Sequence, residues 1–160
     1  MSRLYCKQSK IDGNGLFTSE ALKAGQHVGY IQGPIEIVRN FSPKLSEESM
    51  DWIGVGKYSW INTKESPFRC INHSCEPNVA HVTKRKIIAL IDLPADSELT
   101  MDYSLTEADT DWEIKPCKCG SKICRKVITS IEKLPERIVK VNELVIPQAF
   151  LKIYKNHNKH

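Results

Sequence analysis

The chain has 160 residues, of which 41% are hydrophobic and 26% charged, and its formal net charge is +4. This composition is close to that of an average soluble domain and excludes a disordered, collagen-like or low-complexity chain. No stretch approaches the ~18 apolar residues of a membrane helix, and residues 1–10 lack the apolar core of a secretory signal. We therefore expect an intracellular protein of a reducing compartment, cytoplasmic or, in a eukaryotic host, nuclear, with no membrane partner.

The charge is distributed unevenly along the chain. Residues 1–114 carry 12 basic and 16 acidic side chains, whereas residues 115–160 carry 11 and 3. The sequence thus combines an acidic body with a basic tail that includes Lys152, Lys155 and Lys159. These lysines either contact nucleic acid or, as is more common, keep the helix that carries them soluble. Direct nucleic-acid binding is therefore possible but unsupported by the sequence.

The first two-thirds of the chain predicts short strands separated by turns. A strand follows the glycines of Gly13-Asn14-Gly15, and β-branched residues between turn residues predict further strands at 26–31, 79–83, 86–91 and 98–101. Residues 42–50, which begin with a cap-like serine and a proline, form either a short helix or a loop.

Helical periodicity appears only near the C-terminus. Apolar residues at intervals of three and four over residues 148–156 predict an amphipathic helix whose apolar stripe packs into a core. Residues 134–145 suit either a strand or a helix. We expect a main segment over 1–114, a cysteine-rich segment over 115–127 and a helical extension over 128–160.

The cysteine-rich segment has the composition of a metal site. It places three thiols on a short loop beside a glycine, namely Cys117, Cys119 and Cys124. Tetrahedral zinc needs four such ligands, so the fourth comes from elsewhere, with Cys75 the leading candidate. The alternative is a set of surface thiols or a redox pair. We expect Cys6 and Cys70 to be ordinary small buried residues.

A second polar run, residues 69–78, is neither an amphipathic helix nor an alternating strand. Its dense polar side chains fit an irregular loop in which they satisfy backbone groups. For His73 alone, we favour a hydrogen-bonded structural residue over a proton-transfer base. Gly13-Asn14-Gly15 either lets the backbone approach a ligand or forms a plain tight turn.

The strand at 98–101 leads into Tyr103, which by residue type alone is more often a core aromatic than a catalyst. An acidic run follows it, made up of Glu107, Asp109, Asp111 and Glu113. This run either attracts basic peptides or is a solvated loop.

Four motifs, in this order, together resemble the SET-domain family of protein-lysine methyltransferases. They are G-x-G-L-F at 13–17, R-x-x-N-H-S-C-x-P-N at 69–78, E-L-x-x-D-Y at 98–103 and C-x-C-G-x-x-x-C-R at 117–125. The resemblance covers roughly residues 10–127. It implies a mainly β fold of small curved sheets around a pseudoknot, followed by a zinc-binding post-SET segment. The small size of the chain is similar to that of stand-alone bacterial or viral members of the family.

The resemblance also implies roles for individual residues. S-adenosylmethionine would lie against the backbone of Asn14, Gly15, Leu16 and Phe17 and against Arg69, Asn72 and His73. Tyr103 would be the catalytic phenol. One zinc ion would be held by Cys75, Cys117, Cys119 and Cys124.

The expected activity is methyl transfer from S-adenosylmethionine to a lysine side chain of a basic protein, a histone or a similar protein. The alternatives are a catalytically silent binding module with this fold and a zinc-stabilised nucleic-acid binder, which the acidic body fits poorly. Two departures from the family pattern leave the number of added methyl groups open. Met101 replaces a common phenylalanine, and Tyr30 is displaced by one position, so that it is expected to face away from the lysine channel.

Overall fold

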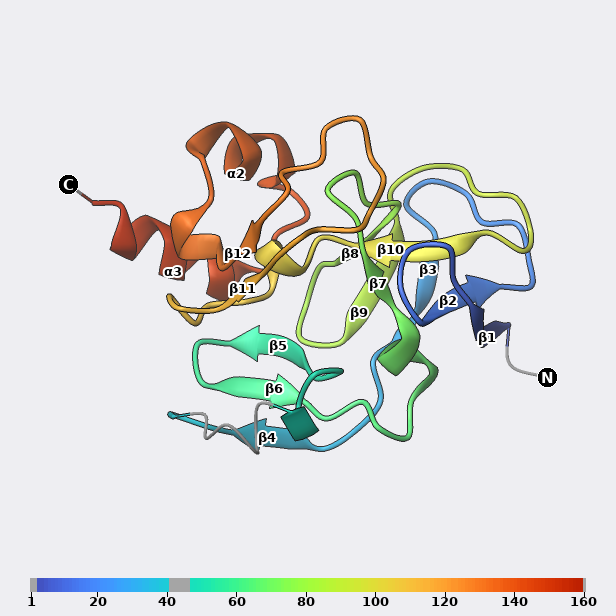
Figure 1. Ribbon diagram of the computed structural model, residues 1–160, viewed down its shortest axis with the longest axis horizontal. Coiled ribbons are helices and arrows are strands. Elements are labelled where there is room, and N and C mark those ends of the chain that lie inside the picture. The colour runs from blue at the N-terminus through green and yellow to red at the C-terminus, as the bar shows by residue number, and fades with distance from the viewer. Residues whose placement is uncertain (1–2, 41–46, 160) are drawn as a thin grey trace.

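The computed structural model describes residues 3–40 and 47–159, and within them the chain forms small β-sheets followed by two C-terminal helices. Figure 1 shows the helices gathered toward the C-terminal end of the long axis and the N-terminus at the opposite end. The prediction of a mainly β fold with a helical extension is confirmed. No helix within the described ranges is long and apolar enough to cross a membrane.

The largest sheet brings together segments that are far apart in the sequence. Its strand order is β1 (Leu4–Gln8), β2 (Asn14–Thr18), β10 (Glu98–Met101) and β7 (Asn72–His73). β1, β2 and β10 are antiparallel, whereas β10 and β7 are parallel (Figure 1). Three of the four sequence motifs therefore meet in this one sheet.

The polar loop after β7 remains attached to β10. The Ser74 N–H donates to the Met101 carbonyl at 3.0 Å, and the Asn78 N–H donates to the Thr100 carbonyl at 3.1 Å. The Asn78 side chain adds a bond to the Glu98 carbonyl at 2.8 Å and accepts one from the Thr100 N–H at 2.8 Å. The loop is thus held on β10 at both its ends, which explains why a polar run lies where a core is expected.

The remaining sheets are antiparallel. One contains β3 (His27–Tyr30), β9 (Lys86–Ala89) and β8 (Val79–His81), and a second contains β4 (Ile35–Ile37), β6 (Ser59–Ile61) and β5 (Ile53–Gly56). A third pairs β11 (Glu113–Ile114) with β12 (Ile128–Thr129). The predicted strands at 26–31, 79–83, 86–91 and 98–101 are confirmed, whereas the strands of the second sheet were not predicted.

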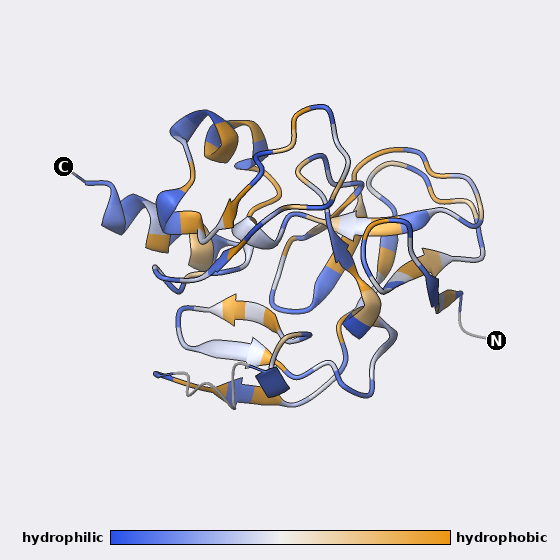
Figure 2. Cartoon of the chain, viewed as in Figure 1, coloured by the Kyte–Doolittle hydropathy of each residue, from blue (hydrophilic) through white to orange (hydrophobic). Residues whose placement is uncertain are grey.

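Within the part of the chain that the structure describes, three short 3₁₀ turns lie between or after the strands, and two α-helices come after the last strand. The turns are η1 (Pro67–Cys70), η2 (Tyr103–Leu105) and η3 (Ile131–Lys133), and the helices are α2 (Glu136–Asn142) and α3 (Gln148–His157). The amphipathic helix predicted at 148–156 is confirmed, and Figure 2 shows its mixture of hydrophilic and hydrophobic residues. Within residues 134–145 the structure has the helix α2, over Glu136–Asn142. Of the segment 42–50, residues 47 and 48 are helical and residues 42–46 lie outside the described ranges.

Two apolar clusters form the core. The first lies among the sheets and includes Leu16, Ile87 and Leu99, all fully buried. The second joins Leu105, two residues after the motif tyrosine, to Phe150 of α3. The C-terminal extension therefore packs on the segment that follows Tyr103. The division of the chain at 114 and 127 stays a prediction.

Gly54 of β5 shows how tightly that segment is held. A Cβ atom on Gly54 would lie 1.9 Å from the Thr106 carbonyl oxygen and 3.4 Å from the Phe150 ring. Only glycine permits this approach. β5 and α3 therefore enclose the chain just after Tyr103 from two sides.

The expectation that Cys6 and Cys70 are ordinary small buried residues is wrong. Cys6 is exposed, Cys70 is buried, and the two form a disulfide across a sequence separation of 64. β1 places Cys6 opposite Leu16 and packs against η1, which ends at Cys70. Long-range packing creates this pair, and no local sequence signal reports it.

We expect the disulfide to contribute strongly to stability. Closing a loop of this length lowers the entropy of the unfolded chain and so stabilises the folded state by about 4 kcal/mol. The variant Cys6→Ser should therefore melt roughly 10 °C below the oxidised protein. Thermal unfolding with and without reductant checks this, because reductant should lower the midpoint of the parent chain and leave the variant unchanged. A parent chain indifferent to reductant would contradict the expectation.

Candidate functional site

Tyr103 lies at the start of η2, directly after β10. Asp102 caps this turn by accepting a hydrogen bond from the Ser104 N–H at 3.1 Å. The Tyr103 hydroxyl donates to the Ile71 carbonyl at 2.5 Å. Burial, reinforced by the carboxylates of Asp12 and Glu98, raises the pKa of Tyr103 well above its usual range. The phenol therefore stays protonated at neutral pH and can act only as a dipole or hydrogen-bond group.

The predicted cofactor residues Asn14, Gly15 and Asn72 meet beside this tyrosine. The Asn72 side-chain amide donates to the Asn14 carbonyl at 3.2 Å and to a Glu98 carboxylate oxygen at 3.0 Å. A Cβ on Gly15 would lie 2.3 Å from that same oxygen. A larger residue here would displace the Glu98 carboxylate, the flexible end of a side chain, from its contact with Asn72.

Leu16 and Phe17 are placed differently. Leu16 is fully buried in the core, and the Phe17 ring stacks on Tyr5 at 5.9 Å. Their backbones pair with β1 on one side and β10 on the other, whereas the pairing with β10 does not extend to Asn14 and Gly15. The part of the predicted 14–17 segment that β10 leaves unpaired is therefore Asn14, which is exposed, and Gly15, which is buried.

Beside Tyr103 is a cavity of about 360 Å³ between β5, η1 and the segment that follows β10. Its aromatic walls, besides Tyr103, are Trp52, Trp60, Phe68 and Trp112. The predicted residue Arg69 is exposed and also lines this cavity. Tyr30 does not line it and is 59% exposed, in agreement with the expectation that it faces away. Sequence reasoning missed the three tryptophans, which belong to no motif.

The acidic run after Tyr103 divides between this cavity and the solvent. Glu107 and Asp109 line the cavity. The Glu107 carboxylate accepts hydrogen bonds from the Trp60 indole N–H at 3.3 Å and from the Ala108 N–H at 2.7 Å, and burial raises its pKa. Glu113 instead forms an ion pair with Lys115. Part of the run therefore faces the cavity, and part is solvated.

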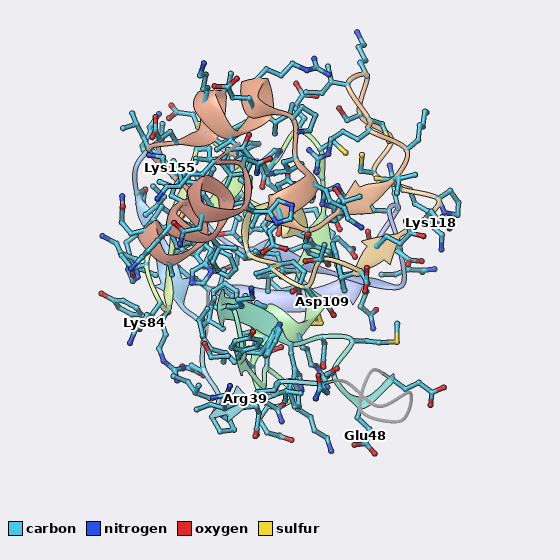
Figure 3. The ribbon with its side chains drawn as sticks, turned by 90° about the vertical axis from the view of Figure 1, so that its left-hand side faces the viewer. Arg39, Glu48, Lys84, Asp109, Lys118 and Lys155 are labelled. Atoms are coloured by element: carbon cyan, nitrogen blue, oxygen red, sulfur yellow. A yellow bond between two sulfur atoms is a disulfide. The ribbon has the colours of Figure 1, made fainter. Side chains whose placement is uncertain are left out.

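The basic tail points outward. Figure 3 shows Lys155 extending from the periphery, as Lys84 and Lys118 do elsewhere, and Lys155 pairs with Glu143 at 3.0 Å. Lys152 and Lys159 are exposed. This arrangement favours the interpretation of these lysines as solvated side chains.

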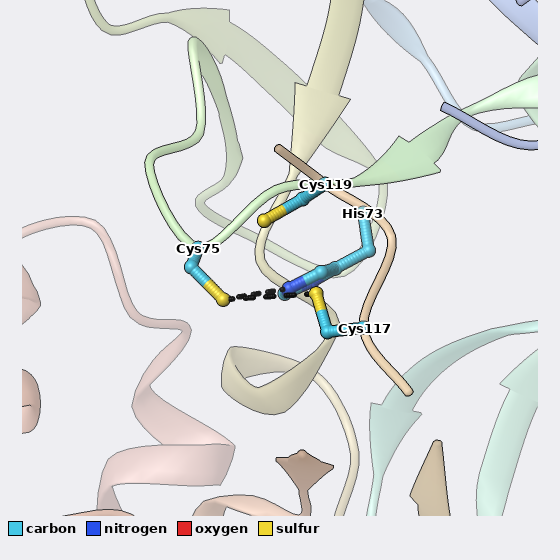
Figure 4. A group of neighbouring side chains, drawn as sticks. All are labelled: His73, Cys75, Cys117 and Cys119. Carbon is cyan, nitrogen blue, oxygen red and sulfur yellow. Dashed lines mark hydrogen bonds between the residues drawn. The ribbon is translucent and has the colours of Figure 1, made fainter. Parts of the chain in front are cut away.

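Three of the four predicted metal ligands lie together. The sulfur atoms of Cys75, Cys117 and Cys119 and a ring nitrogen of His73 all lie within 4.8 Å of one another (Figure 4). Cys124 is outside this group of four, with its sulfur 3.9 Å from the Cys117 carbonyl oxygen. The structure thus brings the post-SET-like loop to the polar loop of residues 72–78.

The thiols of this cluster differ in acidity. Burial raises the pKa of Cys75, and it raises that of Cys117 to about 12. At Cys119, burial is outweighed by backbone N–H groups and by the neighbouring thiols, which lower the pKa to about 7. Thiols that share hydrogen bonds around one thiolate are a donor set suited to a soft cation such as zinc.

His73 contacts this cluster, and the proton on its ring points toward a cluster sulfur. Its Nδ1 accepts a hydrogen bond from the Tyr103 N–H at 3.2 Å, and its Nε2 lies 3.3 Å from the Cys75 sulfur. Burial lowers the pKa of His73 to about 4, so the ring is neutral at physiological pH. A neutral ring that accepts at Nδ1 carries its proton on Nε2 and donates it to the Cys75 sulfur. His73 is therefore a hydrogen-bonded structural residue here.

Comparisons with known proteins agree with these motifs. The SET domain family model matches residues 13–104. The chain is 34% identical over 137 residues to "Histone-lysine N-methyltransferase trithorax" of Drosophila virilis, covering 76% of this chain and 3% of that protein. It is 33% identical over 137 residues to human "Histone-lysine N-methyltransferase 2B", covering 76% of this chain and 5% of the relative.

A third relative aligns over almost the whole chain. The "Variant-silencing SET domain-containing protein" of Plasmodium falciparum is 29% identical over 179 aligned residues, with 98% of this chain and 7% of that protein covered. The chain thus spans only a small fraction of the length of these curated relatives. Since the family model matches more than half of the chain and the motif residues converge on one site, the chain belongs to the SET-domain family.

Proposed function

We propose that this chain is a protein-lysine N-methyltransferase that uses S-adenosylmethionine. The observation that carries the proposal is the position of Tyr103. Its hydroxyl is bonded to Ile71, its pKa is influenced by Asp12 and Glu98 beside the Asn14–Asn72 contact, and its ring lines the cavity. The Tyr103 phenol thus lies between two features: the part of β2 at Asn14 and Gly15 that β10 leaves unpaired, which suits a methyl donor, and a cavity that suits an alkyl amine.

The cavity supports the role of a lysine channel. Its tryptophans and phenylalanine favour the neutral amine over the ammonium, because burial lowers a lysine pKa. The free lysine pKa is about 10.4, so such a lowering is needed before the amine can attack at neutral pH.

Methyl transfer requires the attacking nitrogen to be aligned with the methyl group of the donor. The donor supplies an electrophilic methyl group on a positively charged sulfur; the amine lone pair forms the new N–C bond while the S–C electrons return to sulfur. The amine has already released its proton to water. Tyr103 remains neutral and orients the amine with its hydroxyl dipole, which suits a step that moves positive charge from sulfur to nitrogen.

We propose a basic protein as the substrate. Glu107 and Asp109 place carboxylates in the cavity wall, next to the site where the lysine would enter. The names of the relatives make histones or histone-like tails the first candidates. The two carboxylates would contact the basic residues that flank the target lysine.

We further propose that one zinc ion is held by Cys75, Cys117, Cys119 and Cys124. The N–H that His73 directs at the Cys75 sulfur argues for Cys124 as the fourth ligand, because a protonated nitrogen cannot bind a metal. When bound, the ion would supply structural cross-linking of the two loops. No step of methyl transfer needs it.

Labelled S-adenosylmethionine tests the activity. The protein is incubated with core histones and other lysine-rich proteins, and modified lysines are identified by mass spectrometry. Label on lysine side chains is the expected result. Binding of the donor without transfer to any protein would identify a silent binding module and overturn the proposal.

The pH dependence follows from the charge of the amine. Below the pKa of the bound lysine, kcat should rise about tenfold per pH unit, because only the deprotonated fraction of the bound amine reacts. The raised pKa of Tyr103 means that its ionisation causes no fall in rate up to pH 10. Initial rates between pH 6 and 10 check this. A bell-shaped profile falling below pH 9 would show that a second protonated group is required.

A further inference from the structure

A buried ion pair connects the cysteine loop with the turn that carries Tyr103. Arg125, the residue after Cys124, donates from Nη1 to Asp102 Oδ2 at 2.7 Å and from Nη2 to Asp102 Oδ1 at 2.6 Å. The side chains of Arg125 and Asp102 are only 15% and 2% exposed. Two parallel, charge-assisted hydrogen bonds between buried groups form a strong and directional contact.

This ion pair holds Tyr103 from both sides. Asp102 precedes the tyrosine, and Arg125 Nη2 also donates to the Ser104 hydroxyl, which follows it, at 3.0 Å. The same Asp102 oxygen that Arg125 contacts caps the turn through the Ser104 N–H. The guanidinium therefore binds the side chains of both neighbours of the tyrosine.

The other end of Arg125 is attached to the thiol cluster. Its backbone N–H donates to the Cys75 sulfur at 3.3 Å. From that sulfur a second route returns to the tyrosine, through His73 Nε2 at 3.3 Å and from His73 Nδ1 to the Tyr103 N–H at 3.2 Å. Cys75 and the Tyr103 turn are thus joined by two separate chains of contacts.

We propose that Arg125 is a positioning residue for Tyr103. This role rests on the proposed methyl transfer. Through the Arg125–Asp102 pair, the geometry of the cysteine loop sets the orientation of the phenol. Arg125 does not line the cavity beside Tyr103. Lysine at this position keeps the charge but loses the planar fork that reaches Asp102 and Ser104 together.

The experiment compares Arg125→Lys with the matched variant Arg85→Lys. Arg85 is also partly buried and makes two hydrogen bonds, to the Ile31 and Gly33 carbonyls at 2.8 and 2.9 Å, away from Tyr103. Arg125→Lys should lower kcat on the order of tenfold to a hundredfold with KM for the donor unchanged, because a small misplacement of a reacting group is costly. Arg85→Lys should leave kcat unchanged.

A double-mutant cycle separates positioning from a general loss of structure. In a Tyr103→Phe background, Arg125→Lys should have almost no further effect on kcat, since the hydroxyl it positions is already gone. An equal loss of kcat in both backgrounds would overturn the proposal.

A readout independent of methyl transfer is amide hydrogen exchange. The Tyr103 and Ser104 N–H groups should exchange about tenfold faster in Arg125→Lys and should be unaffected in Arg85→Lys. Unchanged exchange at both amides would refute the positioning role even if the chain proved to be inactive. Asp102→Asn, which keeps an oxygen to cap the turn, should show the same acceleration and serves if Arg125→Lys folds poorly.

Discussion

Tyr103→Phe should lower kcat by about a hundredfold to a thousandfold while leaving the affinity for S-adenosylmethionine unchanged. Removing one preorganised dipole from an active site has effects of this size. The hydroxyl contacts the Ile71 carbonyl and Tyr103 lines the cavity, whereas the contact between Asn14 and Asn72 does not involve the hydroxyl. Single-turnover rates and donor titrations measure the two quantities separately.

The same substitution carries a stability cost that must be distinguished from its effect on rate. Losing the hydroxyl leaves the Ile71 carbonyl without that donor, which costs about 1–3 kcal/mol. Tyr58→Phe, at a 42% exposed tyrosine, is the matched control and should change neither stability nor kcat. A Tyr103→Phe variant that turns over at nearly the parental rate would rule out a catalytic role for the phenol.

The sequence predicted those parts of the site that depend on local patterns. β10 and α3 follow directly from the turn residues that precede the strand and from helical spacing. The motif residues Asn14, Gly15 and Asn72 meet as the resemblance implied, because the sheet order β2-β10-β7 brings their strands together. Sequence motifs of this kind record which backbone segments converge, although they do not record how.

The features that the sequence did not predict all depend on packing between distant segments. Trp52, Trp60 and Trp112 form cavity walls only because β5, β6 and β11 surround the segment after Tyr103. The same limitation applies to the Cys6–Cys70 disulfide and to the Arg125–Asp102 pair. In each case the partners lie in separate elements, so no periodicity or spacing in one stretch of chain could reveal them.

Removal of zinc should abolish turnover before it unfolds the protein. Neither apolar cluster of the core includes a residue of the cysteine loop at 117–126. That loop is attached mainly by polar contacts, such as Ser121 to Glu76 and Lys118 to Asp12, both at 3.0 Å. A chelator should therefore release this loop, and with it the support of Tyr103, while far-ultraviolet circular dichroism stays unchanged.

Variants of single cysteines identify the ligands and the coupling. Cys124→Ser should lower the zinc content and kcat together, whereas Cys6→Ser, which removes a thiol outside the cluster, should keep its zinc. If Cys124→Ser retained full zinc content, His73 would have to be the fourth ligand and its bond from the Tyr103 N–H could not persist as described. Melting of the whole chain in a single step with zinc loss would show instead that the metal is part of the core, since a loop that only orients the phenol can detach without exposing either apolar cluster.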